Sequence, residues 1–199
     1  MKILQKAAIG AAVFILAIVG GLWYSESRVQ AEAVNPETFL RKPMNWHRSS
    51  EKRPYPKLDT VQDFWVHVSI NKNRTYLMDG QRVIYVMYSA AGRFGRRDTR
   101  GHHISDTPTG VFHIQKERGK HFFNPSINCG ANYYVSFHDH GKDNFHSPEV
   151  DRAGHYLPGL ANRIGNRRAT WGCVSLTIPD SIWFYQHVPR GTKVVITKN

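Results

Sequence analysis

The chain has 199 residues, two of them cysteine, and a formal net charge of +12 at pH 7. Two cysteines do not make a disulfide scaffold in a chain of this size, so the fold must rest on burial of apolar side chains. The excess of basic residues suggests an acidic partner, although it also serves simple solubility.

The N-terminus carries an apolar segment. Residues 7–24 contain no charge and follow Lys2 and Lys6. As a helix they would span about 27 Å, close to the hydrocarbon thickness of a bilayer. We predict that residues 1–24 form a membrane anchor that leaves Lys2 and Lys6 in the cytoplasm and the rest of the chain outside. A cleaved signal peptide is the alternative, with the small residues at 31–33 as its cleavage site.

Residues 25–60 are polar and show no helical or strand periodicity. Their four prolines lie among charged residues and favour a partly extended linker outside the membrane, whose last aromatic part, 45–58, docks on the domain. For an exported basic chain, anionic polymers or lipid headgroups are better partners than nucleic acid.

From about residue 61 the pattern becomes that of a β-protein. Residues 64–70 alternate, and Asp79-Gly80 between the apolar runs 75–78 and 82–90 predicts a hairpin with a type I′ turn. Further strands are predicted at 110–115, 132–137 and 192–197.

One short helix is predicted at 179–187, with Pro179 in its first turn and its end before Val188-Pro189. We therefore expect residues 61–199 to form one mainly β domain, a β-sandwich or mixed sheet with one or two short helices.

Two short motifs carry reactive side chains. Gly172-Cys173 lies in "RRATWGCVSL", where glycine permits close approach of a substrate to the backbone and a tight turn can direct N–H groups at an oxyanion. His146-Ser147 follows a predicted strand and a turn, a common place for a general base. A histidine near the cysteine would take its proton, whereas either motif alone is more often structural.

The order of these segments resembles the L,D-transpeptidases of bacterial cell walls, also called YkuD domains. The resemblance covers about residues 62–197 and includes "TPTGVFHI", "NFHS" and "TWGCVSL", while "KRPYPKL" resembles Gram-positive members. His146 matches the first histidine of the family motif, and the second block is matched by Thr170, Gly172 and Cys173.

The motif departs from the family pattern at three places. Trp171 stands where a second histidine is usual, and Ser175 stands where arginine or asparagine is common. The spacing of 27 positions between His146 and Cys173 is longer than the commonest form. Trp171 is a donor through its indole N–H, so the turn is expected to be held differently.

The resemblance implies a cysteine acyltransferase that needs no metal or cofactor. Cys173 would attack a peptidoglycan tetrapeptide stem, releasing D-Ala, and His146 would act as acid and base to form a 3→3 crosslink. The N–H groups of Gly172 and Cys173 would bind the oxyanion, and carbapenems would acylate Cys173. The residues expected to orient the site or to line the substrate groove are Thr170, Ser147, Tyr133, Tyr134 and Trp171.

The same resemblance implies a place at the bacterial cell membrane or, after secretion, in the cell wall. It also leaves two other activities open. Water in place of the amine would make the enzyme an L,D-carboxypeptidase, and a degenerate site would leave a domain that only binds the wall.

Three further hypotheses compete with this assignment. A zinc site is the chemical rival, built from His138, His140 and His146 with Asp139 and Asp143 nearby. Cys129 is either a buried small residue or a partner for a disulfide with Cys173. A basic surface that binds anionic polymers is the third hypothesis, and its residues are Arg93, Arg96, Arg97, Arg100, Arg163, Arg167 and Arg168.

Overall fold

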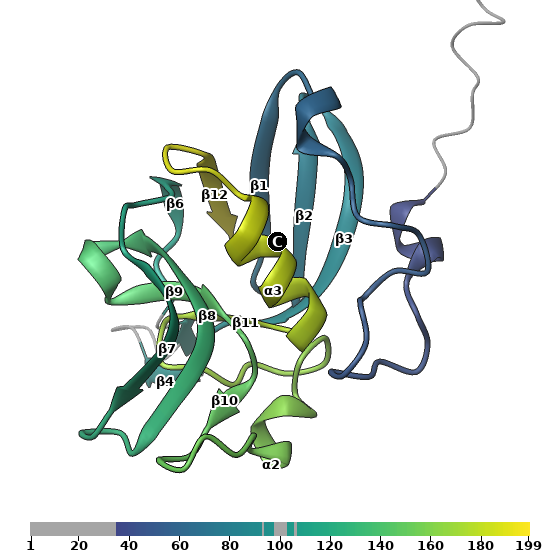
Figure 1. The fold of residues 1–199 in the computed structure, drawn as a ribbon. Helices are drawn as coiled ribbons and strands as arrows, with labels where there is room; N and C mark the ends of the chain where they lie inside the picture. The colour runs from purple at the N-terminus through teal and green to yellow at the C-terminus, as the bar shows by residue number, and fades with distance from the viewer. Residues whose placement is uncertain (1–34, 93, 98–102, 106) are drawn as a thin grey trace, which may run out of the picture. The chain divides into compact units, whose positions relative to one another are not determined.

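The structure, a computed structural model, describes residues 35–92, 94–97, 103–105 and 107–199, as Figure 1 shows. The anchor predicted for residues 7–24 lies outside the described residues and stays a prediction. Within these described ranges, no helix has both the length and the apolar character that crossing a bilayer requires.

Three consecutive strands form an antiparallel meander at the centre of the sheet. β1 (Phe64–Ser69) pairs with β2 (Arg74–Asp79), which pairs with β3 (Arg82–Ala90). The predicted hairpin is confirmed, with Gly80 at φ +57° in its loop. Its turn differs from the predicted type I′, which needs positive φ at both central residues, because Gln81 does not adopt it.

Two strands extend the meander on the side of β1. β12 (Lys193–Thr197) runs parallel to β1, and β6 (Gly110–His113) pairs antiparallel with β12. Both strands were predicted from their alternation of apolar residues.

The other side of the meander continues through strands that the sequence pattern does not predict. β11 (Val174–Leu176) pairs antiparallel with β3, and β9 (Asp143–His146) runs parallel to β11. β8 (Cys129–His138), whose second half was predicted, pairs with β9 and also carries β7 (Arg118–Asn124) and β10 (Glu149–Val150). The order along the sheet is β10-β8-β9-β11-β3-β2-β1-β12-β6, which confirms a mainly β, mixed sheet.

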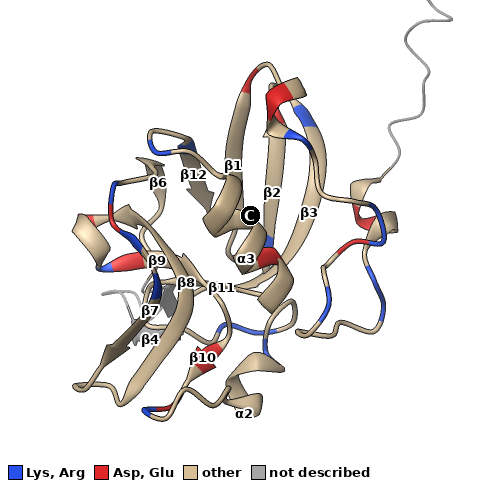
Figure 2. Ribbon diagram, in the orientation of Figure 1, with Lys and Arg blue, Asp and Glu red and all other residues tan. Residues whose placement is uncertain are grey.

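The remaining elements are short. β4 (Phe94–Arg97) and β5 (His103–Ser105) form a separate two-stranded sheet. A four-residue helix, α2 (Pro158–Ala161), and three 3-10 helices, η1 (Pro36–Phe39), η2 (Leu58–Thr60) and η3 (Asp139–Gly141), complete the described part. Basic and acidic residues are distributed over loops and strand ends of this fold rather than on a single element (Figure 2).

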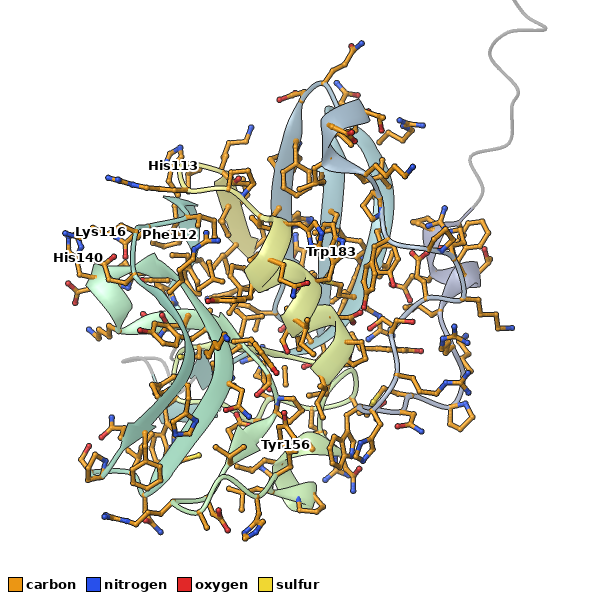
Figure 3. The ribbon with its side chains drawn as sticks, viewed as in Figure 1. Phe112, His113, Lys116, His140, Tyr156 and Trp183 are labelled. Carbon is orange, nitrogen blue, oxygen red and sulfur yellow. The ribbon has the colours of Figure 1, made fainter. Side chains whose placement is uncertain are left out.

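Helix α3 (Ile178–His187) packs across the sheet and fixes the strands beneath it. The Thr177 hydroxyl accepts the Asp180 N–H at 3.3 Å, a capping bond at the start of the helix, and the helix ends before Val188, as predicted. Phe184 stacks on Phe145 of β9 with ring centroids 4.4 Å apart. Trp183 projects from the same helix (Figure 3) and is also buried. Helix α3 therefore covers the core and packs against β9.

Residues 36–60, here called the strap, differ from the linker that the sequence predicted. Pro36–Asn199 forms one unit, in which Leu40 bridges to Glu51 and both are buried. Tyr55 stacks on Trp183 with centroids 5.2 Å apart, so the predicted docking of the aromatic part is confirmed. The prolines and charged residues of this segment predicted a linker. The prediction was wrong because the strap packs through a few long-range contacts that leave no periodic pattern in the sequence.

Two buried carboxylates anchor the strap. Asp180 accepts the Tyr55 hydroxyl at 2.6 Å and both the N–H and the hydroxyl of Ser50, while burial raises its pKa to about 6. Glu51 is fully buried, pairs with Arg53 at 2.6 Å and accepts the Val86 N–H at 2.7 Å. Such bonds matter because a buried polar group left without its partner costs about 1–3 kcal/mol.

Replacing Ser50 by alanine is expected to destabilise the domain by about 2–4 kcal/mol, since it removes a donor to buried Asp180 and the acceptor of the Tyr88 N–H. Urea unfolding followed by circular dichroism measures this change. Ser49→Ala is the control and should cost less than about 1 kcal/mol, because Ser49 is only partly buried and bonds one nearby carbonyl. Equal losses in the two variants would contradict the anchoring role of Ser50.

Candidate active site

Two short parallel strands bring His146 and the segment of Cys173 together. The register of β9 on β11 pairs Phe145 with Val174 and His146 with Ser175. Because side chains alternate along a strand, Phe145 and Val174 enter the core while His146 and Ser175 lie on the other face. Cys173 comes directly before β11, at the end of the strand pair where this face meets solvent.

A cavity of about 860 Å³ opens over this end of the strands, and both His146 and Cys173 line it. Its volume is within the range of sites that bind small molecules or peptide segments. Apolar parts of the wall come from Pro108, Phe122, Ile127 and Trp171. Polar parts come from His138, Lys142, Asp143, Asn144, Glu149 and Thr170.

His146 is held in one tautomer. Its Nδ1 donates to the Ser147 carbonyl at 2.6 Å, which leaves the lone pair on Nε2. The Ser175 hydroxyl donates to the same carbonyl at 3.2 Å, and the Ser147 hydroxyl donates to the Pro148 carbonyl at 2.7 Å. Burial lowers the pKa of His146 to about 4, so the imidazole is neutral at pH 7 and able to accept a proton.

The Cys173 thiol lies in a polar contact shell. Its Sγ accepts the Asn144 N–H at 3.3 Å and approaches the Asn144 Nδ2 at 4.0 Å, while the S–H donates to the Lys142 carbonyl at 3.7 Å. Burial raises the pKa of Cys173 to about 12, against the opposing effect of the Asn144 N–H. Within the described part of the chain no hydrogen bond joins Cys173 to His146. The resting pair is therefore a neutral thiol and a neutral imidazole.

Two threonines fix the turn before Cys173. The Thr170 hydroxyl donates to the Cys173 carbonyl and accepts the Gly172 N–H at 3.3 Å. Thr107 donates to the Gly172 carbonyl at 2.8 Å. Gly172 has φ +141°, a backbone conformation that side chains disfavour. The Gly172 N–H, predicted as an oxyanion donor, is thus already engaged by Thr170.

The residues predicted to line a substrate groove divide into two groups. Trp171 lines the cavity with 60% of its surface exposed. Tyr133 packs against Tyr185 of α3, and Tyr134 packs against the edge of Phe122 at a centroid distance of 5.4 Å. Neither tyrosine is among the described residues that line the cavity, and Phe122 takes that place.

Three features of the site were missed by sequence reasoning. Asn144 contacts the thiol, Ser175 contacts the carbonyl that orients His146, and His138 pairs with Asp143 at 2.7 Å on the cavity wall. Asn144 precedes His146 by two positions, so strand alternation places them on one face. The spacing would have predicted this shared face only if "DNFH" had been identified as a strand.

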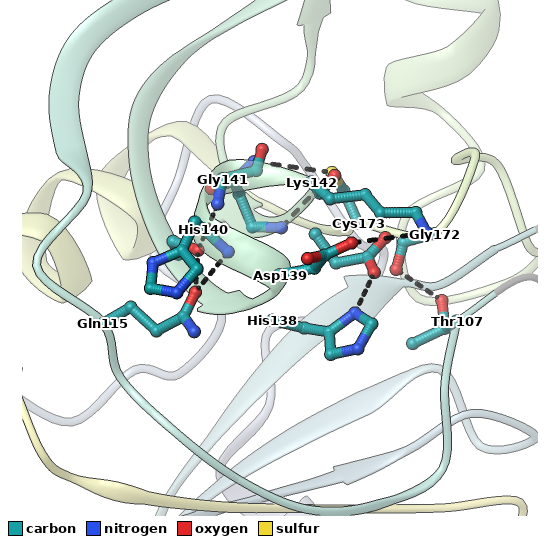
Figure 4. Close-up of polar contacts among 12 residues, drawn as sticks. Thr107, Gln115, His138, Asp139, His140, Gly141, Lys142, Gly172 and Cys173 are labelled. Carbon is teal, nitrogen blue, oxygen red and sulfur yellow. Dashed lines mark hydrogen bonds and ion pairs between the residues drawn. The ribbon is translucent and has the colours of Figure 1, made fainter.

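The zinc hypothesis is not supported by the arrangement of the histidines. The Nδ1 atoms of His138 and His140 contact Asp143 and Glu117 respectively, and Figure 4 shows His140 beside Gln115, apart from His138. Among the residues that the structure describes, no group of three or more His, Cys, Asp or Glu side chains is arranged to hold a metal ion.

No disulfide joins Cys129 and Cys173 in the described structure. Cys129 pairs with Asn124 near the β7–β8 turn, whereas Cys173 lies beside Asn144, whose partner on β8 is Ser136. Both cysteines line the cavity, but the strand register does not place them opposite one another. The disulfide hypothesis is therefore not supported.

The structure describes the side chains of only some of the arginines in the proposed basic surface. Arg93 and Arg100 lie outside the described residues, as do the side chains of Arg96 and Arg97. Of the others, Arg168 donates to the Asn71 amide oxygen at the protein surface. Binding of anionic polymers stays a prediction.

Comparison with known proteins links the chain to one family. The family model YkuD, described as the L,D-transpeptidase catalytic domain, matches residues 63–196. A Bacillus subtilis (strain 168) protein named "Putative L,D-transpeptidase YciB" is 35% identical over 133 residues, which span 67% of this chain and 65% of that protein.

Solved structures share the fold. An L,D-transpeptidase from Mycobacterium smegmatis aligns with a TM-score of 0.51 and 16% identity over 68% of this chain and 58% of its own. Another, from Xylanimonas cellulosilytica, aligns with a TM-score of 0.51 and 18% identity over 73% of this chain and 64% of its own. At these identities the likeness concerns the fold alone.

Iodoacetamide is expected to alkylate Cys173 slowly near neutral pH, because desolvation raises the pKa of this half-buried thiol and keeps it protonated. In a Cys129→Ser background, the rate at pH 7 should be at least about 10-fold below that of a free cysteine, whose pKa is about 8.5, and should keep rising to pH 10. Mass spectrometry of the adduct gives the rate. A plateau between pH 5 and pH 8 would indicate a thiolate–imidazolium pair and contradict the neutral resting state.

Replacing Ser175 by alanine is expected to lower the reactivity of Cys173 toward an acylating β-lactam about 10-fold, since the carbonyl that orients His146 loses a donor. Ser181→Ala is the matched control, because Ser181 is also a buried serine that donates to a carbonyl, at 2.8 Å, but it belongs to α3. Adduct formation is followed by mass spectrometry. Equal reactivity in the two variants would mean that Ser175 is only structural.

Proposed function

Because the chain belongs to the YkuD family of L,D-transpeptidase catalytic domains, we propose that it joins peptidoglycan stem peptides by 3→3 crosslinks, with Cys173 as nucleophile. One observation carries the proposal. His146 and Cys173 line the same cavity, and the bond from His146 Nδ1 to the Ser147 carbonyl leaves Nε2 as the base.

The first half-reaction forms an acyl-enzyme. The Cys173 thiol gives its proton to His146 Nε2 as sulfur attacks the carbonyl carbon of the third residue of a tetrapeptide stem. The Cys173 N–H stabilises the oxyanion, joined by the Gly172 N–H when it leaves Thr170. The bond to the terminal D-Ala nitrogen then breaks, His146 protonates that nitrogen, and a thioester remains.

The neutral resting pair has a functional consequence. A thiol kept protonated by burial resists oxidation, because the thiolate is the form that oxidants attack. Proton transfer to His146 is then coupled to the attack itself and needs a substrate carbonyl in position.

The second half-reaction decides the product. An amine of a neighbouring stem that attacks the thioester gives the 3→3 crosslink, whereas water gives a shortened stem and makes the enzyme an L,D-carboxypeptidase. Because Lys142 lies on the cavity wall, it is the cation best placed to bind a carboxylate of the stem. Its ammonium also forms an ion pair with Asp139 at 3.7 Å.

The proposed setting is the outer face of the bacterial cell membrane. Residues 7–24 would anchor the chain there or would be removed with a signal peptide, leaving a secreted wall enzyme. The formal net charge of +12 would favour contact with anionic wall polymers.

Incubation with purified tetrapeptide muropeptides tests the function. We expect crosslinked dimer and free D-Ala from the wild type and from Cys129→Ser, a loss of at least about 10³-fold in Cys173→Ala, and about 10²–10⁴-fold in His146→Gln. Mass spectrometry of the muropeptides and of a carbapenem adduct on Cys173 measures both steps.

The outcomes separate the candidate activities. If the wild type gives shortened stems without dimer, the enzyme is an L,D-carboxypeptidase and not a transpeptidase. A folded wild type that gives neither product nor adduct would leave only a wall-binding role, and dimer from Cys173→Ala would exclude Cys173 as the nucleophile.

A further inference from the structure

Amide formation in the second half-reaction needs two proton acceptors, and this inference rests on the function proposed above. A side-chain amine with a pKa near 10.4 arrives as an ammonium at pH 7, and its nitrogen keeps one proton in the product amide. Two protons therefore leave it. His146 can take one and return it to the sulfur of Cys173 when the C–S bond breaks, so the other proton needs a second base.

A second imidazole, that of His138, lies on the cavity wall. His138 and Asp143 face each other across β8 and β9, and His138 Nδ1 contacts Asp143 Oδ2 at 2.7 Å. In the described structure His138 Nε2 has no protein hydrogen bond. His138 and Cys173 both line the cavity, and Asp143, the partner of His138 in Figure 4, directly precedes Asn144, whose N–H contacts Cys173 Sγ at 3.3 Å.

Other groups on the wall are less suited to accept a proton. Trp171 offers an indole N–H, which only donates, and Lys142 is itself an ammonium. The amide of Asn144 is not basic. Glu149 is the other acidic side chain on the wall. It is buried on β10 and pairs with Ala131, near the end of β8 opposite His138, so it is less suited to pass a proton to water.

We propose that His138, held by Asp143, is the base that deprotonates the acceptor ammonium. The pair has the donor–acceptor arrangement in which a carboxylate fixes the tautomer and stabilises the imidazolium that forms. Asp143 is 5% exposed, so its charge acts on His138 with little screening by water.

The proton has a route to solvent. The His138 side chain is 35% exposed, and it also lines a second hollow of about 570 Å³. Phe112, His113, Lys116 and His140, which gather at one edge of the domain in Figure 3, line that hollow as well. His138 thus stands between the site of chemistry and open water.

The atoms balance in the following way. The ammonium gives one proton to His138 Nε2, and the neutral amine attacks the thioester carbon. The N–C bond forms, the C–S bond breaks, and the second proton passes through His146 to the Cys173 sulfur. His138 then releases its proton to water. Attack by water needs no second base, because water loses one proton in forming the acid and the sulfur takes it.

This contrast gives the test. In full-length protein with tetrapeptide donor and an amine acceptor, His138→Gln is expected to lower the ratio of dimer to shortened stem by about 10²-fold or more, and Asp143→Asn should lower it less. His140→Gln is the matched control and should keep the wild-type ratio, because His140 lies beside Gln115, outside the cavity. Glu149→Gln is measured beside it, because Glu149 is the other acidic side chain on the cavity wall.

A second acceptor separates proton transfer from structural damage. Hydroxylamine is neutral at pH 7, so thioester attack by hydroxylamine should proceed at wild-type rate in His138→Gln. An unchanged dimer ratio in His138→Gln, a loss confined to Glu149→Gln, or equal losses with both acceptors would overturn the assignment. Failure of the wild type to form a carbapenem adduct would instead count against the proposed function, which keeps the two failures distinct.

Discussion

The parallel pairing of β9 with β11 is the constraint on which the site depends. It sets His146 opposite Ser175, directs Phe145 and Val174 into the core, and leaves Cys173 at the open end beside Asn144. A shift of one residue would turn His146 into the core and Phe145 into the cavity, because strand side chains alternate. The burial of Phe145 thus fixes the position of the proposed base.

That burial is secured by packing that reaches far from the cavity. Phe145 stacks on Phe184 of α3, and α3 is held in turn by the strap through Asp180, Ser50 and Tyr55. The strap therefore belongs to the support of the site although it contributes nothing to the cavity wall. The two carboxylates that anchor the strap, Glu51 within it and Asp180 on α3, tolerate burial because each is met by several donors.

The chemistry of the cavity follows from the desolvation of two reactive groups, His146 and Cys173. Burial lowers the pKa of His146 and raises the pKa of Cys173, so both are neutral until a substrate arrives. On the other wall His138 keeps contact with a carboxylate and with solvent, an environment suited to gaining and releasing a proton. Two imidazoles in different surroundings can thereby serve different steps of one reaction.

The sequence by itself determined the β-rich class, the meander with its Asp79-Gly80 hairpin, the limits of α3, and the pair His146 and Cys173. Those features rest on local patterns, namely alternation, turn residues, helix ends and a family motif. Only the tertiary structure decided that "DNFH" and "VSL" are strands, since both are too short to show a period, and that the first part of the strap, around Leu40, also packs on the domain. It also placed Phe122, rather than Tyr133 or Tyr134, at the cavity. The contacts of Asn144, Ser175 and His138 near the reacting groups were likewise decided by the tertiary structure. They arise from the register between strands that are distant along the chain.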